Sequence, residues 1–190
     1  MAVEVRKLLT PTDIEDMIDR GELCSDDMFE LVNGEIVWLA PAFNKHGATC
    51  MLVGSKLMPF AQQIGAVVVD GQTGFRVGEH LQQLRSPDVS LITKERLDIV
   101  PERGFNHGAP DLAVEVLSEG QEAEGYARPK IPEYFSAGAK VVWFLDLRTR
   151  TVREYLPNQL EYRVYSTEAE ITLDAIAPGF RCRVSEFFPN

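Results

Sequence analysis

Residues 110–117 read PDLAVEVL, an apolar run that a proline and an aspartate precede and that one glutamate interrupts. A short run of this composition after a turn signal is typical of a buried β-strand. Glu115 shares a face of this strand with Ala113 and Leu117, because successive side chains alternate between the two faces. A buried carboxylate is costly unless it is paired, protonated or bound to a metal. The stretch therefore predicts a buried strand whose glutamate has a partner.

Shorter apolar or alternating runs on both sides of this stretch predict further strands. Asn33-Gly34 separates two of these runs and is a strong signal for a two-residue hairpin turn. The expected strands cover residues 29–32, 36–39, 66–69, 73–77, 88–92, 141–145, 151–156, 161–165 and 171–173.

Helical spacing is present before and between these runs. Thr10-Pro11 opens a short helix, with a capping residue and a proline in the first turn. Residues 44–64 repeat apolar side chains at helical spacing, and Pro59 is expected to kink or interrupt the later part. A short helix is predicted at residues 131–137, and residues 184–188 form a helical or capping segment.

The order of these elements predicts an α/β fold with a central mixed β-sheet flanked by helices. The strands do not alternate regularly with helices, which disfavours a doubly wound dinucleotide fold. No repeat or linker divides the 190 residues, so we expect a single domain over residues 1–190. No apolar run reaches the ~18 residues that span a bilayer, and the N-terminus lacks the apolar core of a secretion signal. The sequence therefore predicts a cytoplasmic protein with no membrane partner.

Cysteine usage and charge exclude several other classes of protein. Cys24, Cys50 and Cys182 are scattered, so they suggest neither a zinc site nor a disulfide framework, and free thiols are expected. The formal net charge is −10 and no dense Lys/Arg stripe exists, so strong nonspecific DNA binding is not predicted. There is no phosphate-binding loop, no nucleophile elbow and no paired-histidine zinc motif.

Asp88 follows Pro87 and opens the predicted strand at residues 88–92. A long loop separates it from the strand of Glu115, so the two strands can lie side by side. Two converging carboxylates would favour a hard cation such as Mg²⁺. Each acid also has a simpler explanation: Asp88 as a turn residue, and Glu115 as the partner of a buried Lys or Arg or as a residue on an exposed face.

Several short segments, in this order, are similar to one known family. They are FELVNGEIV at 29–37, His46, FRV at 75–77, PD at 87–88, PDLAVEVLS at 110–118, Lys130, Tyr134, AG at 137–138, WFLD at 143–146 and PGF at 178–180. With this set, which spans nearly the whole chain, the sequence resembles the Uma-type restriction endonuclease family of the PD-(D/E)XK nuclease superfamily.

The resemblance implies a restriction-endonuclease-like fold and a metal-dependent endonuclease that cleaves nucleic acid, expected to be DNA. Asp88 and Glu115 would be metal ligands for Mg²⁺ or Mn²⁺. Leu117 occupies the usual position of the motif lysine, and Lys130 would take its catalytic role from the next helix. Glu30 matches an N-terminal acid that could be an extra ligand, often through water.

The chain departs from the family pattern around Lys130. Glu119 replaces a proline, residues 120–128 lack an aspartate, and Pro129 and Pro132 bracket Lys130, which we place at a helix start. Lys130 could instead be a solvated surface lysine. Glu30 could be a solvated acid of the hairpin, and His46 a helix-capping or surface residue.

These departures and the net charge leave a second function open. The chain could be a catalytically inactive nuclease-fold protein that binds nucleic acid or protein, or an oligomeric scaffold. A homodimer is expected, since edge-like strands near the C-terminus and the apolar pair Phe187-Phe188 could mediate pairing.

Overall fold

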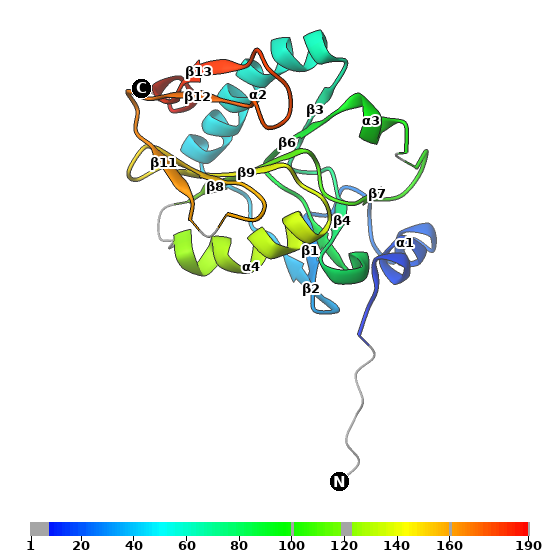
Figure 1. Ribbon diagram of the computed structural model, residues 1–190. Helices are drawn as coiled ribbons and strands as arrows, with labels where there is room; N and C mark the ends of the chain where they lie inside the picture. Colours follow the sequence, from blue (N-terminus) through cyan, green and yellow to red (C-terminus); the bar gives the residue numbers. More distant parts are fainter. Residues whose placement is uncertain (1–7, 100, 119–122, 160, 190) are drawn as a thin grey trace.

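A six-stranded mixed sheet forms the centre of the molecule (Figure 1). The computed structural model describes residues 8–99, 101–118, 123–159 and 161–189. β8 and β9 are parallel, and every other neighbouring pair in this sheet is antiparallel. In spatial order the strands are β11 (Arg163–Tyr165), β10 (Thr151–Tyr155), β9 (Val141–Asp146), β8 (Leu112–Leu117), β6 (Val89–Ile92) and β3 (Val67–Asp70).

A second sheet of five strands contains the N-terminal hairpin. Asn33 and Gly34 both have positive φ (51° and 77°), which suits the tight turn that joins its first two strands. Its order is β2 (Glu35–Trp38), β1 (Phe29–Val32), β5 (Gln83–Arg85), β4 (Phe75–Val77) and β7 (Asn106–His107).

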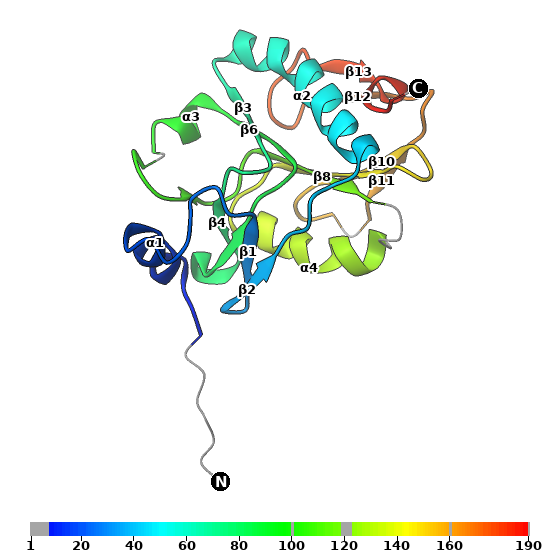
Figure 2. The ribbon, with the colours of Figure 1, turned by 180° about the vertical axis from the view of Figure 1, so that it is seen from behind.

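Helices cover both faces of the six-stranded sheet. α2 (Asn44–Ile64) lies on one face and α4 (Ala123–Ser136) on the other (Figures 1 and 2). α1 (Pro11–Asp19) lies beside the second sheet, and its capping box at Thr10 and Asp13 confirms the predicted helix start. The remaining elements are short: α3 (Lys94–Leu97), η1 (Glu79–Leu81), η2 (Val184–Phe187) and the ribbon of β12 (Glu170–Thr172) with β13 (Arg181–Arg183).

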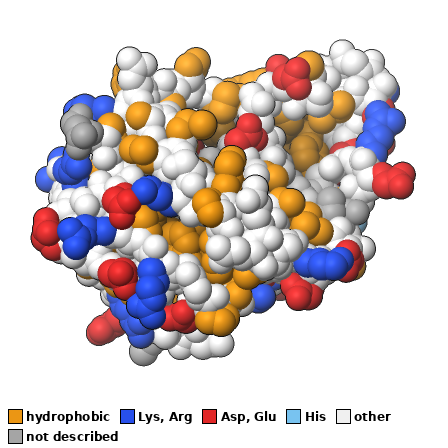
Figure 3. Space-filling model, turned by 90° about the horizontal axis from the view of Figure 1, so that it is seen from above, with side chains coloured by type: hydrophobic (Ala, Val, Ile, Leu, Met, Phe, Trp, Pro, Cys, Tyr) orange, Lys and Arg blue, Asp and Glu red, His pale blue; other side chains and the backbone are white. Residues whose placement is uncertain are grey.

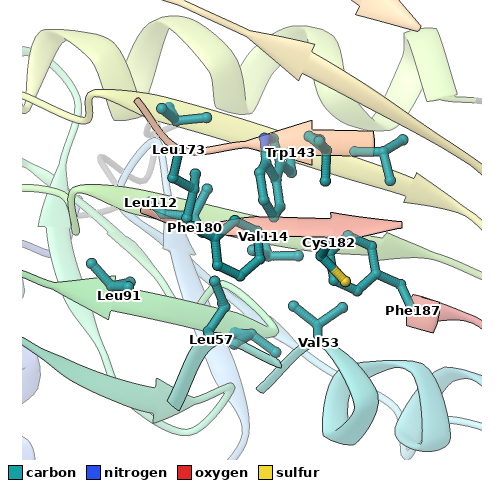
Figure 4. Packing of buried hydrophobic residues seen from close by; sticks show 14 of the residues in the cluster. Val53, Leu57, Leu91, Leu112, Val114, Trp143, Leu173, Phe180, Cys182 and Phe187 are labelled. Atoms are coloured by element: carbon teal, nitrogen blue, oxygen red, sulfur yellow. The ribbon is translucent and has the colours of Figure 1, made fainter. Parts of the chain in front are cut away.

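The alternation of side chains along β8 divides the core in two. Val114 and Val116 point toward α2, where they join a cluster with Trp143 and Phe180 (Figure 4). Ala113 and Leu117 pack in the cluster on the α4 side. Glu115 has the same parity as this second pair, so its carboxylate faces α4.

The predicted α/β architecture with a central mixed sheet and an N-terminal hairpin is confirmed, and the predicted bounds of α2 and β8 are correct. The expected interruption at Pro59 is wrong, because α2 continues through it. Pro59 is exposed, so the carbonyl that it leaves without a donor can reach water. The sequence did not predict the short elements β5, β7, β13, α3 and η1.

The prediction for the third helix is also wrong. α4 begins at Ala123 rather than near residue 131, so Lys130 lies inside the helix and not at its start. Pro129 and Pro132 are both exposed, so a helix containing them costs less than it would in the core.

Phe187 and Phe188 do not form an exposed pairing surface. Their side chains are buried, and the ring of Phe187 lies 5.8 Å from that of Trp143. The apolar pair therefore completes the core of its own chain, which removes one of the two features that suggested a dimer. Within the described part of the chain, no helix combines the length and apolar character needed to cross a membrane.

Candidate active site

Asp88 and Glu115 lie at the same end of two neighbouring strands. Val89 pairs with Val114 in the antiparallel register of β6 and β8, so Asp88 falls one step on, opposite Glu115. The Oδ2 atom of Asp88 accepts a hydrogen bond of 2.6 Å from the backbone N–H of Val116. The structure thus brings together the two acids that the sequence singled out.

Glu115 is buried among groups that bind both of its oxygens. Lys130 Nζ lies 3.0 Å from each carboxylate oxygen, and the hydroxyl of Tyr134 donates to Oε1 at 2.5 Å. Burial raises the pKa of Glu115 to about 7, and the charge of Lys130 opposes this rise. The charge of Asp88 raises the pKa of Glu115 further, which is consistent with two acids close together.

Lys130 is a buried residue of α4, so the surface-lysine interpretation is wrong. It shares a face of the helix with Tyr134, one turn later, and both side chains reach Glu115. Its ammonium also donates to Glu30 Oε1 at 3.1 Å. From its position inside α4, this amine reaches Glu115 of the sheet. Glu119, one of the departures from the family pattern, lies outside the described residues.

Glu30 is a buried acid held by two cations, so the interpretation as a solvated hairpin residue is wrong. Its Oε1 accepts the hydrogen bond from Lys130, and its Oε2 accepts a hydrogen bond of 2.6 Å from Nη1 of Arg85. Arg85 in turn donates to Glu133 of α4 through Nε (2.7 Å) and Nη2 (3.1 Å). We call Glu30, Arg85, Lys130 and Glu133 the ionic network; it joins the five-stranded sheet to α4.

His46 and Cys50 complete the surroundings of Asp88 from the N-terminal part of α2. His46 Nε2 lies 3.0 Å from Asp88 Oδ1, and Nδ1 lies 3.2 Å from the hydroxyl oxygen of Ser118. The hydrogen bond with Asp88 raises the pKa of His46. The ligand atoms of His46, Cys50 and Asp88 all lie within 4.8 Å of one another.

Sequence reasoning missed Arg85 and Cys50. An arginine immediately before Ser86-Pro87-Asp88 was a signal for a charged group near the acid. Cys50 follows His46 by four positions on a predicted helix, a spacing that places two side chains on one face. Neither signal indicates a site until the fold brings Asp88 to the same place.

The donor groups at the site fit a divalent cation. Asp88 and Glu115 offer carboxylate oxygens, which hard cations such as Mg²⁺ prefer. The Lys130 ammonium binds both oxygens of Glu115 in this structure and so compensates the charge of this buried acid. A bound cation could therefore neutralise part of the negative charge of Glu115 that Lys130 neutralises in this structure.

Comparison with known proteins places the chain in one family. Residues 18–185 match the Uma2 family, described as "Putative restriction endonuclease". The fold is similar to that of a solved structure described as a "putative nuclease belonging to DUF820" from Anabaena variabilis, with a TM-score of 0.76 and 21% sequence identity. The likeness covers 95% of this chain and 97% of that one. No curated protein sequence gives a significant match. The match over residues 18–185 shows that this chain belongs to the Uma2 family.

Proposed function

We propose that the chain is a divalent-metal-dependent endonuclease that hydrolyses phosphodiester bonds of nucleic acid, with DNA as the first candidate substrate. The observation that carries the proposal is the meeting of an acid pair with a buried amine. Lys130 Nζ is 3.0 Å from both oxygens of Glu115, and Asp88 lies at the neighbouring strand position. Membership of the Uma2 family supports the same reaction class.

Asp88 and Glu115 are the residues that would hold the cation, Mg²⁺ or Mn²⁺. When bound, such an ion supplies Lewis acidity toward the phosphate and lowers the pKa of a coordinated water. Asp88 is kept in place by the N–H of Val116 and by His46, so it needs little rearrangement to act as a ligand.

Lys130 would stabilise the reacting phosphate and orient the attacking water, and its burial strengthens this electrostatic effect. An ammonium shielded from water interacts strongly with charge that develops on the phosphate, and its N–H groups can orient the attacking water. Glu30 accepts hydrogen bonds from both Lys130 and Arg85, so we assign it as a residue that positions the amine of Lys130. Tyr134 fixes the carboxylate of Glu115 from the same helix.

A non-catalytic scaffold with a nuclease fold is the second candidate, and the charge of the chain favours it. The formal net charge is −10. On the face shown in Figure 3, basic and acidic side chains are interspersed and form no continuous basic patch. A protein that binds nucleic acid through phosphate contacts would gain from such a patch. Binding of Mg²⁺ or Mn²⁺ separates the candidates, because a scaffold has no need of such a cation held by both Asp88 and Glu115.

The test is a cleavage screen on single- and double-stranded DNA and RNA, with Mg²⁺ or Mn²⁺ titrated against the metal-free protein. We expect Asp88→Asn and Glu115→Gln to abolish metal-dependent cleavage. Lys130→Met should reduce kcat by about 10²–10³-fold, the usual effect of removing one electrostatic donor. Asp98→Asn is the matched control, since Asp98 is an exposed acid paired with Lys94.

Two results would count against the proposal. Cleavage that persists at the wild-type rate in Asp88→Asn would exclude the assigned ligands. Calorimetry that finds no Mg²⁺ or Mn²⁺ binding dependent on Asp88, together with no cleavage of any substrate, would favour the scaffold.

A further inference from the structure

The proposed nuclease chemistry gives Cys50, beside Asp88, no task and uses His46 only to keep Asp88 in place. His46 and Cys50 are one turn apart on α2, and both reach toward the start of β6. The ligand atoms of these three residues lie within 4.8 Å of one another, and all three residues are half-buried. Groups that are held together in this way can act on one bound ion.

The ring of His46 is already oriented as a metal ligand would be. Ser118 lies 3.2 Å from Nδ1, which directs Nε2 toward Asp88 Oδ1. Histidines that bind metals are usually fixed through the second ring nitrogen in the same manner. The contact with Ser118 therefore presents Nε2 to the cluster without further rearrangement.

The chemistry of the donors selects the class of ion. Cys50 offers sulfur, His46 nitrogen and Asp88 oxygen. Mg²⁺ takes oxygen ligands almost exclusively, whereas thiolate and imidazole suit Zn²⁺ and related transition metals. Three protein ligands and one open position are the usual arrangement of an accessible zinc site.

Solvent can reach the cluster along the beginning of α2. A hollow of about 420 Å³ is lined by His46 and Ser118 together with Phe43, Lys45 and Leu147. Phe43 is exposed at its rim. The hollow therefore brings solvent to His46, the member of the cluster that lines it.

We propose that His46, Cys50 and Asp88 form a binding site for a thiophilic transition-metal ion of the Zn²⁺ class. Tetrahedral coordination, with Zn–S of about 2.3 Å and Zn–N of about 2.0–2.1 Å, separates sulfur and nitrogen by about 3.5 Å. Because the ligand atoms are at most 4.8 Å apart, the cluster would contract by at most little more than about 1 Å. The site shares Asp88 with the proposed catalytic pair but does not depend on nuclease activity.

Co²⁺ is a suitable probe, because thiolate ligation gives it an intense charge-transfer absorption. The full chain, freed of metal and kept reduced, is titrated with Co²⁺ and followed by absorption spectroscopy. We expect one Co²⁺ per chain with a thiolate band. Zn²⁺ should displace the Co²⁺ and remove the band, while a large excess of Mg²⁺ should leave it unchanged.

Variants identify the ligands. Cys50→Ser and Cys50→Ala should both lose the thiolate band, and Cys24→Ser, which changes an exposed thiol, should keep it. Ser118→Ala should retain the band but weaken Co²⁺ binding by about 10–100-fold, as loss of an outer-shell partner does. Circular dichroism checks that each variant is folded.

The inference is overturned if the folded wild-type protein shows no thiolate band. It is equally overturned if the band survives in both variants of Cys50. Because the readout is spectroscopic, an inactive nuclease would leave this result unaffected.

Discussion

Burial controls the protonation of Glu115 when no metal is present. The pKa of this carboxyl rises from 4.5 to about 7 because water is excluded, and Lys130 only partly offsets the effect. A raised pKa means that the folded protein holds the proton more tightly than the unfolded chain. The stabilisation from this group is therefore complete below about pH 4.5 and is lost as the pH rises to about 7.

Glu115→Gln tests this linkage. Over that pH range the wild-type protein should lose about 3 kcal/mol of unfolding free energy relative to the variant, since a glutamine cannot ionise. Urea unfolding at a series of pH values, with EDTA present, measures the difference. Glu22→Gln, at an exposed acid paired with Arg20, should follow the wild-type pH profile. Parallel profiles for wild type and Glu115→Gln would show that the buried carboxyl does not titrate in this range.

Individual residues also differ in how far the sequence could reveal them. The positions of Asp88 and Glu115 were predictable, because Glu115 interrupts an apolar strand and Asp88 follows a proline at the start of another. The role of Lys130 came only from resemblance, since nothing local distinguishes a lysine between two prolines from a surface residue. Arg85 and Cys50 owe their positions to contacts between distant segments, which local patterns do not encode.

At the scale of elements, long periodic segments were predictable and short ones were not. α2 and β8 carry enough apolar repeats to fix their bounds, whereas β7 consists of Asn106 and His107 and has no pattern of its own. The error at α2 came from treating proline as a break. At α4 the predicted helix already contained Pro132, and the error was to begin it at residue 131 rather than at Ala123. Exposure decides the outcome, because a proline on the solvent side leaves a carbonyl that water can reach.

This explanation predicts that the substitution Pro59→Ala stabilises the protein. An alanine at this position restores one backbone hydrogen bond within α2, and the unfolding free energy should rise by about 1–3 kcal/mol, reduced by the greater freedom of the unfolded chain. Thermal or urea unfolding gives the value. Met58→Ala, at the neighbouring exposed position, should change it by less than about 0.5 kcal/mol. A less stable Pro59→Ala protein would mean that contacts of the proline ring outweigh the missing bond.

At the scale of the whole molecule, the ionic network and its contact with Glu115 link two sheets and a helix. Arg85 binds Glu30 of β1 and Glu133 of α4, and Lys130 binds Glu30 and Glu115 of β8. The side chains of Arg85, Glu30 and Lys130 are at most 5% exposed. Such a network contributes less to net stability than its charges suggest, because burying them is costly. Removing one member of the network should nevertheless destabilise the protein strongly, because it leaves a buried charge without an opposite charge beside it.

Arg85→Met should therefore lower the unfolding free energy by about 3–5 kcal/mol. Arg103→Met is the matched control: it removes an arginine that is 81% exposed and paired with Asp19, so the change should be below about 1 kcal/mol. The double variant Arg85→Met/Glu30→Gln should recover part of the loss, because one uncompensated carboxylate is neutralised. Recovery in the double variant would place the cost in the stranded charge of Glu30. If both variants are equally unstable, the loss arises from packing of the arginine side chain or from Glu133, which also loses its cation, and not from the charge of Glu30.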